Sequence, residues 1–162
     1  AGNYPIRRIS TLGEVFIFFT PKQLFMNSKK FLIGGIAGGI AFFLLGWLVW
    51  GMLLMDFMKS HSNSSSGVFR TEADMVWWAM VVGNLAMGFL LSYVLSKASI
   101  NTAAGGISTG AVIGLLMSAS IDCTMYAQVN LFDTTSMIAD IGASTVVTGI
   151  VSGIIGWING KL

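Results

Sequence analysis

Two aspartates lie inside long apolar stretches of the sequence, where a charged side chain is least expected. Asp122 lies about one helical turn before the end of the stretch 105–126, and Asp140 lies about one turn after the start of the stretch 137–158. If the two stretches form an antiparallel pair of helices, the two carboxylates are at a similar depth. A carboxylate inside a membrane span is costly and marks a candidate functional site.

No Lys or Arg lies within either stretch to neutralise these carboxylates. Two close carboxylates without a cationic partner should not both be ionised, so the pair would favour a bound cation or proton. Tyr126, Gln128 and Asn130 follow Asp122 and could supply neutral oxygen ligands. The alternative is that Asp122 and Asp140 are solvated at the headgroup boundary, where a charge costs little, and only mark helix ends.

The other side chains capable of chemistry indicate ordinary roles. His61 stands alone in a Ser-rich segment without metal-ligand spacing, and Cys123 has no base beside it. The sequence contains no His-Glu-x-x-His pattern, no phosphate-binding loop after a strand and no pair of histidines at haem spacing. We therefore expect no enzyme activity and no cofactor, and we assign no metal apart from the candidate cation or proton site of Asp122, Asp140 and Tyr126.

The composition indicates the environment in which these side chains lie. Of the 162 residues, 54% are hydrophobic and 10% are charged, whereas an ordinary soluble domain has about 45–50% apolar and about 25% charged residues. Such a chain cannot cover a water-facing surface with charge. The composition indicates an integral membrane protein in contact with the lipid bilayer. It excludes a disordered chain, a disulfide scaffold and a nucleic-acid-binding protein.

Four apolar blocks are long enough to cross a bilayer, whose core of about 30 Å needs about 20 helical residues. They do not alternate apolar and polar residues as the strands of a membrane barrel do. The first block is also longer than the apolar core of a signal peptide, which has about 7–15 residues. The sequence therefore predicts an all-α integral membrane protein, an antiparallel four-helix transmembrane bundle formed by residues 31–162. The expected spans are residues 31–55, 75–95, 105–126 and 137–158.

Basic residues in the short flanks predict the orientation of these spans. Seven Lys and Arg residues flank one side of the bundle and two flank the other, and such an excess marks the cytoplasmic side. The N-terminus and the C-terminus are therefore expected in the cytoplasm. The seven are Arg7, Arg8, Lys22, Lys29, Lys30, Lys97 and Lys161, and the two are Lys59 and Arg70.

Residues 1–30 form a cytoplasmic or interfacial segment in this prediction. Residues 15–19 are apolar but too few to span, and Pro21 interrupts any helix that continues from them. The segment could lie along the membrane surface with its basic residues near anionic lipid. Alternatively, residues 1–25 are an upstream extension of a chain that starts naturally at Met26.

Small residues repeat at intervals of four along three of the expected spans. In lipid, small residues let helix backbones approach closely, so these ridges predict tight packing within the chain or in a homo-oligomer. Asn84, near the middle of the second span, is expected to be buried and to form a hydrogen bond across helices. The ridge residues are Gly34, Gly35, Gly38, Gly39, Gly106, Gly110, Gly114, Ser118, Gly149 and Gly153.

Two short polar segments predict where helices begin. Residues 71–74 (Thr-Glu-Ala-Asp) resemble a capping box before the second span, and Asp133 is placed to cap the fourth span. An acidic side chain at a helix start is also favoured by the helix dipole. We therefore expect structural roles for these acidic residues.

One stretch of the chain runs from Met26-Asn27-Ser28-Lys29-Lys30-Phe31 through Gly46-Trp47-Leu48-Val49-Trp50-Gly51. With this stretch the chain resembles small four-span bacterial inner-membrane proteins of uncharacterised function, a likeness in layout that covers residues 26–162. The resemblance implies a location in the bacterial inner membrane and carries over no catalytic or binding residue.

The function expected from the sequence is that of a helix-packing structural or accessory subunit, which acts with itself or within a larger membrane complex. The alternative is an oligomeric transporter or channel-like protein for a cation, proton or small solute, which uses the acidic site near the outer surface. A third possibility, an enzyme that acts on lipid or quinone, would need a pocket that joins Asp122, Asp140 and Tyr126 to the bilayer.

Overall fold

The computed structural model describes residues 27–62, 70 and 72–162, and the N-terminal segment 1–26 lies outside the described residues. Every regular element in the described part is a helix, and an isolated backbone bridge joins Ser62 to Phe132. The prediction of an all-α fold is confirmed.

Four helices are long and apolar enough to cross a membrane, as the sequence predicts. Each begins and ends within three residues of its predicted span. The chain is therefore compatible with a multi-pass membrane protein. The four are α2 (Ser28–Leu48) with its continuation in the π-helical turn η2 (Val49–Leu53), α4 (Trp77–Lys97), α5 (Ala103–Gln128) and α6 (Thr134–Lys161). Two short elements, α3 (Met55–Ser60) and η3 (Glu72–Asp74), come between α2 and α4 in the sequence.

Side chains at the helix starts explain three of these boundaries. The side chains of Asn27 and Thr102 accept hydrogen bonds from backbone N–H groups at the starts of α2 and α5, at 3.0 and 3.1 Å. The carboxylate of Asp133 accepts one from the backbone N–H of Ser136 at 2.8 Å, as predicted for α6. Each cap satisfies a donor that the helix itself leaves unpaired.

The start of α4 differs from the sequence prediction. Residues 72–74 form a separate 3₁₀ turn, and α4 begins at Trp77 after Val76, which offers no side-chain cap. The predicted capping box therefore does not start this helix. Asp74 is exposed, and the apolar residues that follow it form α4.

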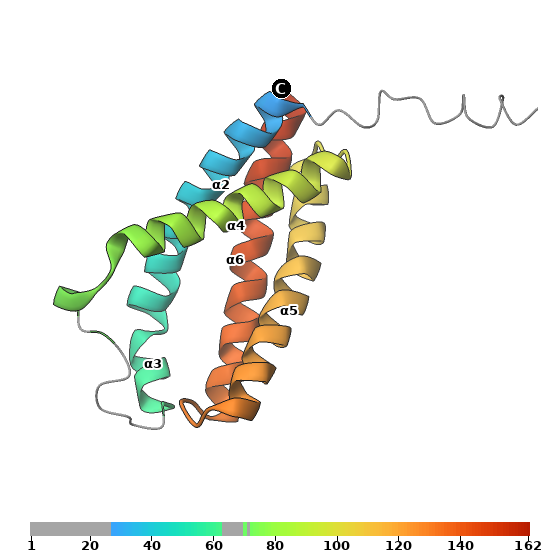
Figure 1. Cartoon of the computed structure of the whole chain (residues 1–162). Helices are drawn as coiled ribbons and strands as arrows, with labels where there is room; N and C mark the ends of the chain where they lie inside the picture. Colours follow the sequence, from blue (N-terminus) through green and yellow to red (C-terminus); the bar gives the residue numbers. More distant parts are fainter. Residues whose placement is uncertain (1–26, 63–69, 71) are drawn as a thin grey trace, which may run out of the picture.

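Each of the four long helices packs mainly against one or two of the others. α5 and α6 form a hairpin, and α2 lies against both α4 and α6 (Figure 1). α4 crosses α2 and leans away from α5 and α6 toward its own start (Figure 1). As a result α5 depends mainly on α6 for its packing.

The α5–α6 hairpin is close because α5 presents glycines to its neighbour. A Cβ atom added to Gly114 would lie 2.7 Å from Cβ of Thr148, and one added to Gly110 would collide with the side chain of Ser152. At Gly106 an added Cβ would meet the backbone of Ser152. Successive glycines of α5 therefore meet successively earlier residues of α6. The two backbones are too close at these points for larger side chains.

Glycines of α2 work in the same way against two helices. A Cβ atom added to Gly38 would lie 2.7 Å from Cδ1 of Ile155 in α6, and one added to Gly39 would lie 2.8 Å from Cα of Leu85 in α4. Gly88 of α4 faces the α2 backbone in return. The remaining ridge residues are also buried: Gly34, Gly35, Ser118, Gly149 and Gly153.

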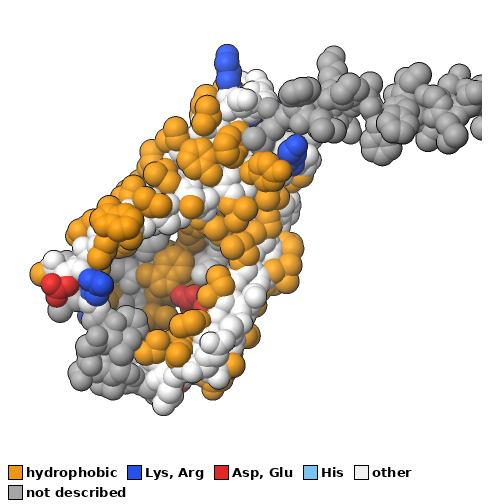
Figure 2. All heavy atoms as spheres, viewed as in Figure 1, with side chains coloured by type: hydrophobic (Ala, Val, Ile, Leu, Met, Phe, Trp, Pro, Cys, Tyr) orange, Lys and Arg blue, Asp and Glu red, His pale blue; other side chains and the backbone are white. Residues whose placement is uncertain are grey.

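Most large apolar side chains point outward. Figure 2 shows them over much of the visible face, where a bilayer would cover them. α6 carries the longest run of buried residues, which makes it the central helix of the described part. The buried large apolar side chains are Phe42, Leu91, Leu95, Val147, Val151 and Ile155.

Candidate functional site

Asp122 and Asp140 occupy matching positions on the two helices of the hairpin. Asp122 lies six residues before the last residue of α5, and Asp140 lies six residues after the first residue of α6. Both side chains are half-buried, and the carboxyl groups lie close enough for their charges to interact. The structure therefore brings together the two acids that the sequence placed at a similar depth.

A third residue, Trp50, reaches this pair from α2. Its Nε1 donates a hydrogen bond to Oδ1 of Asp140 at 2.6 Å. Trp50 lies in η2, where the backbone N–H of Leu54 donates to the carbonyl of Val49, five residues earlier, at 2.7 Å. Such a π-helical turn changes the direction of the side chains it carries and often occurs at functional sites.

The two carboxyl groups differ in their hydrogen-bond partners. Asp140 accepts from Trp50 through Oδ1, and the hydroxyl of Ser144 donates to its Oδ2 at a long 3.5 Å. Oδ2 of Asp122 is buried and has no hydrogen-bond partner in the described part of the chain. A buried oxygen without a donor is unfavourable, so this position suits a proton or a cation.

Tyr126 does not take the position expected for a ligand of the cation or proton site. Its hydroxyl lies 3.0 Å from Oγ1 of Thr134, where either oxygen can donate, and its side chain is 44% exposed. With Gln128 and Asn130 it lines an open pocket of about 460 Å³ at the α5–α6 connection. The hydrogen-bond partner of the Tyr126 hydroxyl is therefore at the start of α6 and is neither Asp122 nor Asp140.

Two further acids in the described part of the chain and the histidine do not extend the site. Asp56 and Asp74 are exposed, and Nδ1 of His61 lies 2.9 Å from the carbonyl of Phe57 in the preceding helix turn. Among the described residues, no three His, Cys, Asp or Glu side chains gather where they could hold a metal ion. Cys123 is exposed.

Asn84 forms a different hydrogen bond from the predicted one. Its amide donates to the backbone carbonyl of Met80 at 2.7 Å, within its own helix, and its side chain is half-buried. The expectation of a bond across helices is therefore wrong for this donor. Ser92 provides such a bond instead, since its hydroxyl donates to the carbonyl of Phe31 in α2 at 3.0 Å.

A second polar cluster lies at the end of the molecule opposite the α5–α6 turn. Its hydrogen bonds connect three segments of the chain. Nζ of Lys30 donates to the backbone carbonyl of Asn159 at 2.6 Å and to Oδ1 of Asn101 at 3.0 Å. Asn159 is 1% exposed, and its amide donates to the carbonyl of Ile100 at 3.3 Å. A cation at the last carbonyls of a helix is favoured by the helix dipole.

Sequence reasoning missed Trp50 and the second role of Lys30. In the sequence Trp50 stands near the end of the first span, where tryptophan is common in membrane proteins and indicates no specific contact. The one signal that pointed to it was its place near the end of the first span, at the level of the acids. Comparison of the chain with protein-family models, with curated proteins and with solved structures finds no match. Function is therefore inferred from Trp50, Asp122 and Asp140 themselves.

Proposed function

We propose that this protein binds a proton or a small cation between Asp122 and Asp140 inside the membrane and takes part in its transport. The matching positions of these two acids on adjoining helices, with carboxyl groups close enough for their charges to interact, carry the proposal. In the described part of the chain neither acid forms an ion pair with Lys or Arg. Two carboxylates close together repel each other unless a cation or proton lies with them.

The surroundings of the pair support an occupied site. Asp140 is oriented by Trp50, while one oxygen of Asp122 is left without a donor. Ionisable groups inside spans that face other helices commonly mark ion paths. Figure 2 shows a hollow below α4 with an acidic side chain at its edge.

Four spans are few for a path within one chain, so we propose that transport takes place in an oligomer. The small-residue ridges are used inside the chain, where they face Thr148, Ser152, Ile155 and Leu85. Contacts between copies would therefore use the outer apolar faces rather than these ridges.

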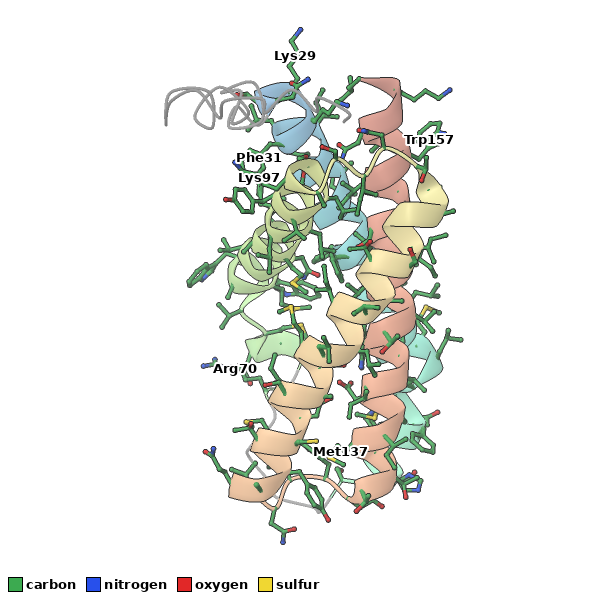
Figure 3. The ribbon with its side chains drawn as sticks, turned by 90° about the vertical axis from the view of Figure 1, so that its right-hand side faces the viewer. Lys29, Phe31, Arg70, Lys97, Met137 and Trp157 are labelled. Atoms are coloured by element: carbon green, nitrogen blue, oxygen red, sulfur yellow. The ribbon has the colours of Figure 1, made fainter. Side chains whose placement is uncertain are left out.

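The distribution of basic residues supports a cytoplasmic position for both ends of the described part. Lys29 and Lys97 lie at one end of the helices and Arg70 lies toward the other (Figure 3). Lys30 and Lys161 lie at the same end as Lys29 and Lys97. We name the end that carries these four lysines the basic end. An excess of Lys at one end marks the cytoplasmic side.

The accessory-subunit function is the second candidate, and the first half of α4 favours it. Trp77 and Trp78 are 51% and 72% exposed, and nothing lies within 4 Å of a Cβ atom added to Gly83. α4 leans away from α5 and α6 here (Figure 1), so a partner helix would find an uncovered apolar face. Purification in mild detergent would identify a partner, and crosslinks through position 78 would place it.

Ion flux into proteoliposomes tests the main proposal. The purified protein is reconstituted with a pH-sensitive dye inside the vesicles, and H⁺, Na⁺ or K⁺ gradients are applied. We expect a flux that is lost in Asp122→Asn and in Asp140→Asn and kept in Asp56→Asn, an exposed acid of α3. Flux that is equal in all three variants would reject the proposal.

A further inference from the structure

A second site lies at the end of the molecule opposite the basic end, between α3 and the α5–α6 connection. A partly open pocket of about 320 Å³ lies there, within the range of about 300–1,000 Å³ that small-molecule sites occupy. Its walls come mainly from apolar side chains. They are Trp50, Met55, Met58, Leu131 and Phe132.

Backbone hydrogen bonds hold the two sides of this pocket together. The backbone N–H of Asp133 donates to the carbonyl of His61 at 3.1 Å, and Ser62 pairs with Phe132 in the isolated bridge. Ser136, which is 1% exposed, donates from its hydroxyl to Sδ of Met58 at 3.3 Å. The pocket is therefore formed before any ligand arrives, and the Met58 sulfur is already engaged.

One charged side chain, Lys59, lines the pocket in the described part of the chain. Lys59 is exposed and makes no ion pair with a described residue. A single ammonium group at the edge of an apolar pocket is complementary to an anionic head with an apolar tail. The small volume favours one acyl chain over the two of a phospholipid.

We propose that this pocket binds a medium-chain fatty acid, with the carboxylate at Lys59 and the acyl chain among Met55, Met58 and Phe132. Methionine side chains adapt to flexible apolar ligands. Trp50 connects the pocket to the acidic pair, because it lines the pocket and also donates to Asp140. The fatty acid is thus a second ligand, distinct from the ion.

Photo-crosslinking tests this proposal on the full chain in nanodiscs of zwitterionic lipid. The probe is decanoate with a photoreactive diazirine at the end of its tail, and mass spectrometry identifies the labelled peptides. We expect labels in α3 and in residues 131–136. Labels spread evenly over the lipid-facing helices would overturn the proposal.

Lys59→Met provides the charge test, with Lys97→Met at the basic end as its matched control. We expect label in the pocket to fall at least threefold in Lys59→Met and to stay unchanged in Lys97→Met. A decyl trimethylammonium probe, which has the same chain length and the opposite charge, should not label the pocket. Equal labelling by both probes, or an equal effect of the two lysine variants, would contradict the proposal.

Asp122→Asn separates this site from the ion site, because Asp122 does not line the pocket. Pocket labelling should therefore persist in Asp122→Asn even where ion flux is lost. Loss of labelling in Asp122→Asn would show that the pocket is not an independent site.

Discussion

Trp50 connects two of the features that matter most in this molecule. Its indole N–H lies 2.6 Å from Oδ1 of Asp140, and its side chain also lines the pocket beside Lys59. Tryptophan combines a large apolar surface with one hydrogen-bond donor, so a single residue can line the apolar pocket and also bind the carboxyl group of Asp140. The π-helical turn that carries it makes this position differ from that of an ordinary interfacial tryptophan.

We expect Trp50→Phe to destabilise the fold by about 1–3 kcal/mol, because it leaves an oxygen of Asp140 without its donor. Reversible unfolding in mixed micelles would measure the free energy. Trp78→Phe is the matched control, since Trp78 is 72% exposed and should change stability little. Equal effects of the two substitutions would mean that the bond to Asp140 contributes nothing measurable.

The acidic pair could be foreseen from the sequence, and its surroundings could not. Two acids at equal distances from a short turn must come close once the hairpin forms, so composition and spacing suffice for Asp122 and Asp140. Tyr126 was grouped with them by proximity in sequence, but its hydroxyl lies beside Thr134. Asn84 was assigned a partner in another helix, while the carbonyl of Met80 in its own helix is nearer.

At the scale of helices, the α5–α6 contact depends on residues without side chains. A Cβ atom added to Gly110 would collide with Ser152 and lie 2.7 Å from the backbone carbonyl oxygen of Thr148. We expect Gly110→Ala to destabilise the protein by about 1–3 kcal/mol, the usual cost of overpacking.

Gly142→Ala is the matched control on α6, because nothing lies within 4 Å of the Cβ atom it would gain. It should stabilise the helix by about 0.5–1 kcal/mol through lost chain entropy in the unfolded state. Unfolding of both variants under the same conditions gives the comparison. A Gly110→Ala protein as stable as Gly142→Ala would be inconsistent with close packing at this glycine.

Lys30 joins the start of α2 to the end of α6 and to the α4–α5 connection. We expect Lys30→Met to destabilise the protein by about 1–3 kcal/mol, because it removes donors from the Asn159 carbonyl and from Asn101. Lys29→Met changes the neighbouring exposed lysine and should have little effect. Hydrogen exchange at the end of α6 would localise the loss, and protection that is unchanged there would contradict this role.

Helix positions follow from length and composition, and helix starts follow only in part. Apolar length alone predicts the four spans within three residues. Asp133 caps α6 as its residue type suggests, whereas the acidic turn before α4 stays outside the helix that it was expected to start. A capping pattern therefore predicts the helix start after the short α5–α6 turn. It does not predict the helix start after the longer polar connection that precedes α4.

For the molecule as a whole, the order of the helices is the feature that sequence reasoning could not supply. The glycine ridges predict close contacts but do not name the partners. In the structure one α2 surface meets α4 and another meets α6, with Gly39 near Leu85 and Gly38 near Ile155. The crossing of α4 over α2, which leaves its first half uncovered, has no sequence signal that we can identify.

The proposed orientation can be tested with two cysteines at opposite ends. In a Cys123→Ser background, Ser60→Cys at the end of α3 should react with a membrane-impermeant maleimide in intact cells, and Ala98→Cys after α4 should react only after lysis. The expectation follows from the excess of Lys at the basic end. The reverse pattern would place the basic end outside the cell.

Infrared difference spectroscopy of the protein in nanodiscs tests the central claim most directly, because it observes the carboxyl groups themselves. Spectra are recorded between acidic and alkaline buffer, with and without Na⁺ or K⁺. Proton or cation binding by the pair predicts a carboxyl signal that disappears in Asp122→Asn and in Asp140→Asn and is retained in Asp56→Asn. Wild-type spectra identical to those of Asp122→Asn and Asp140→Asn would contradict the account, since the two acids would then bind neither ion.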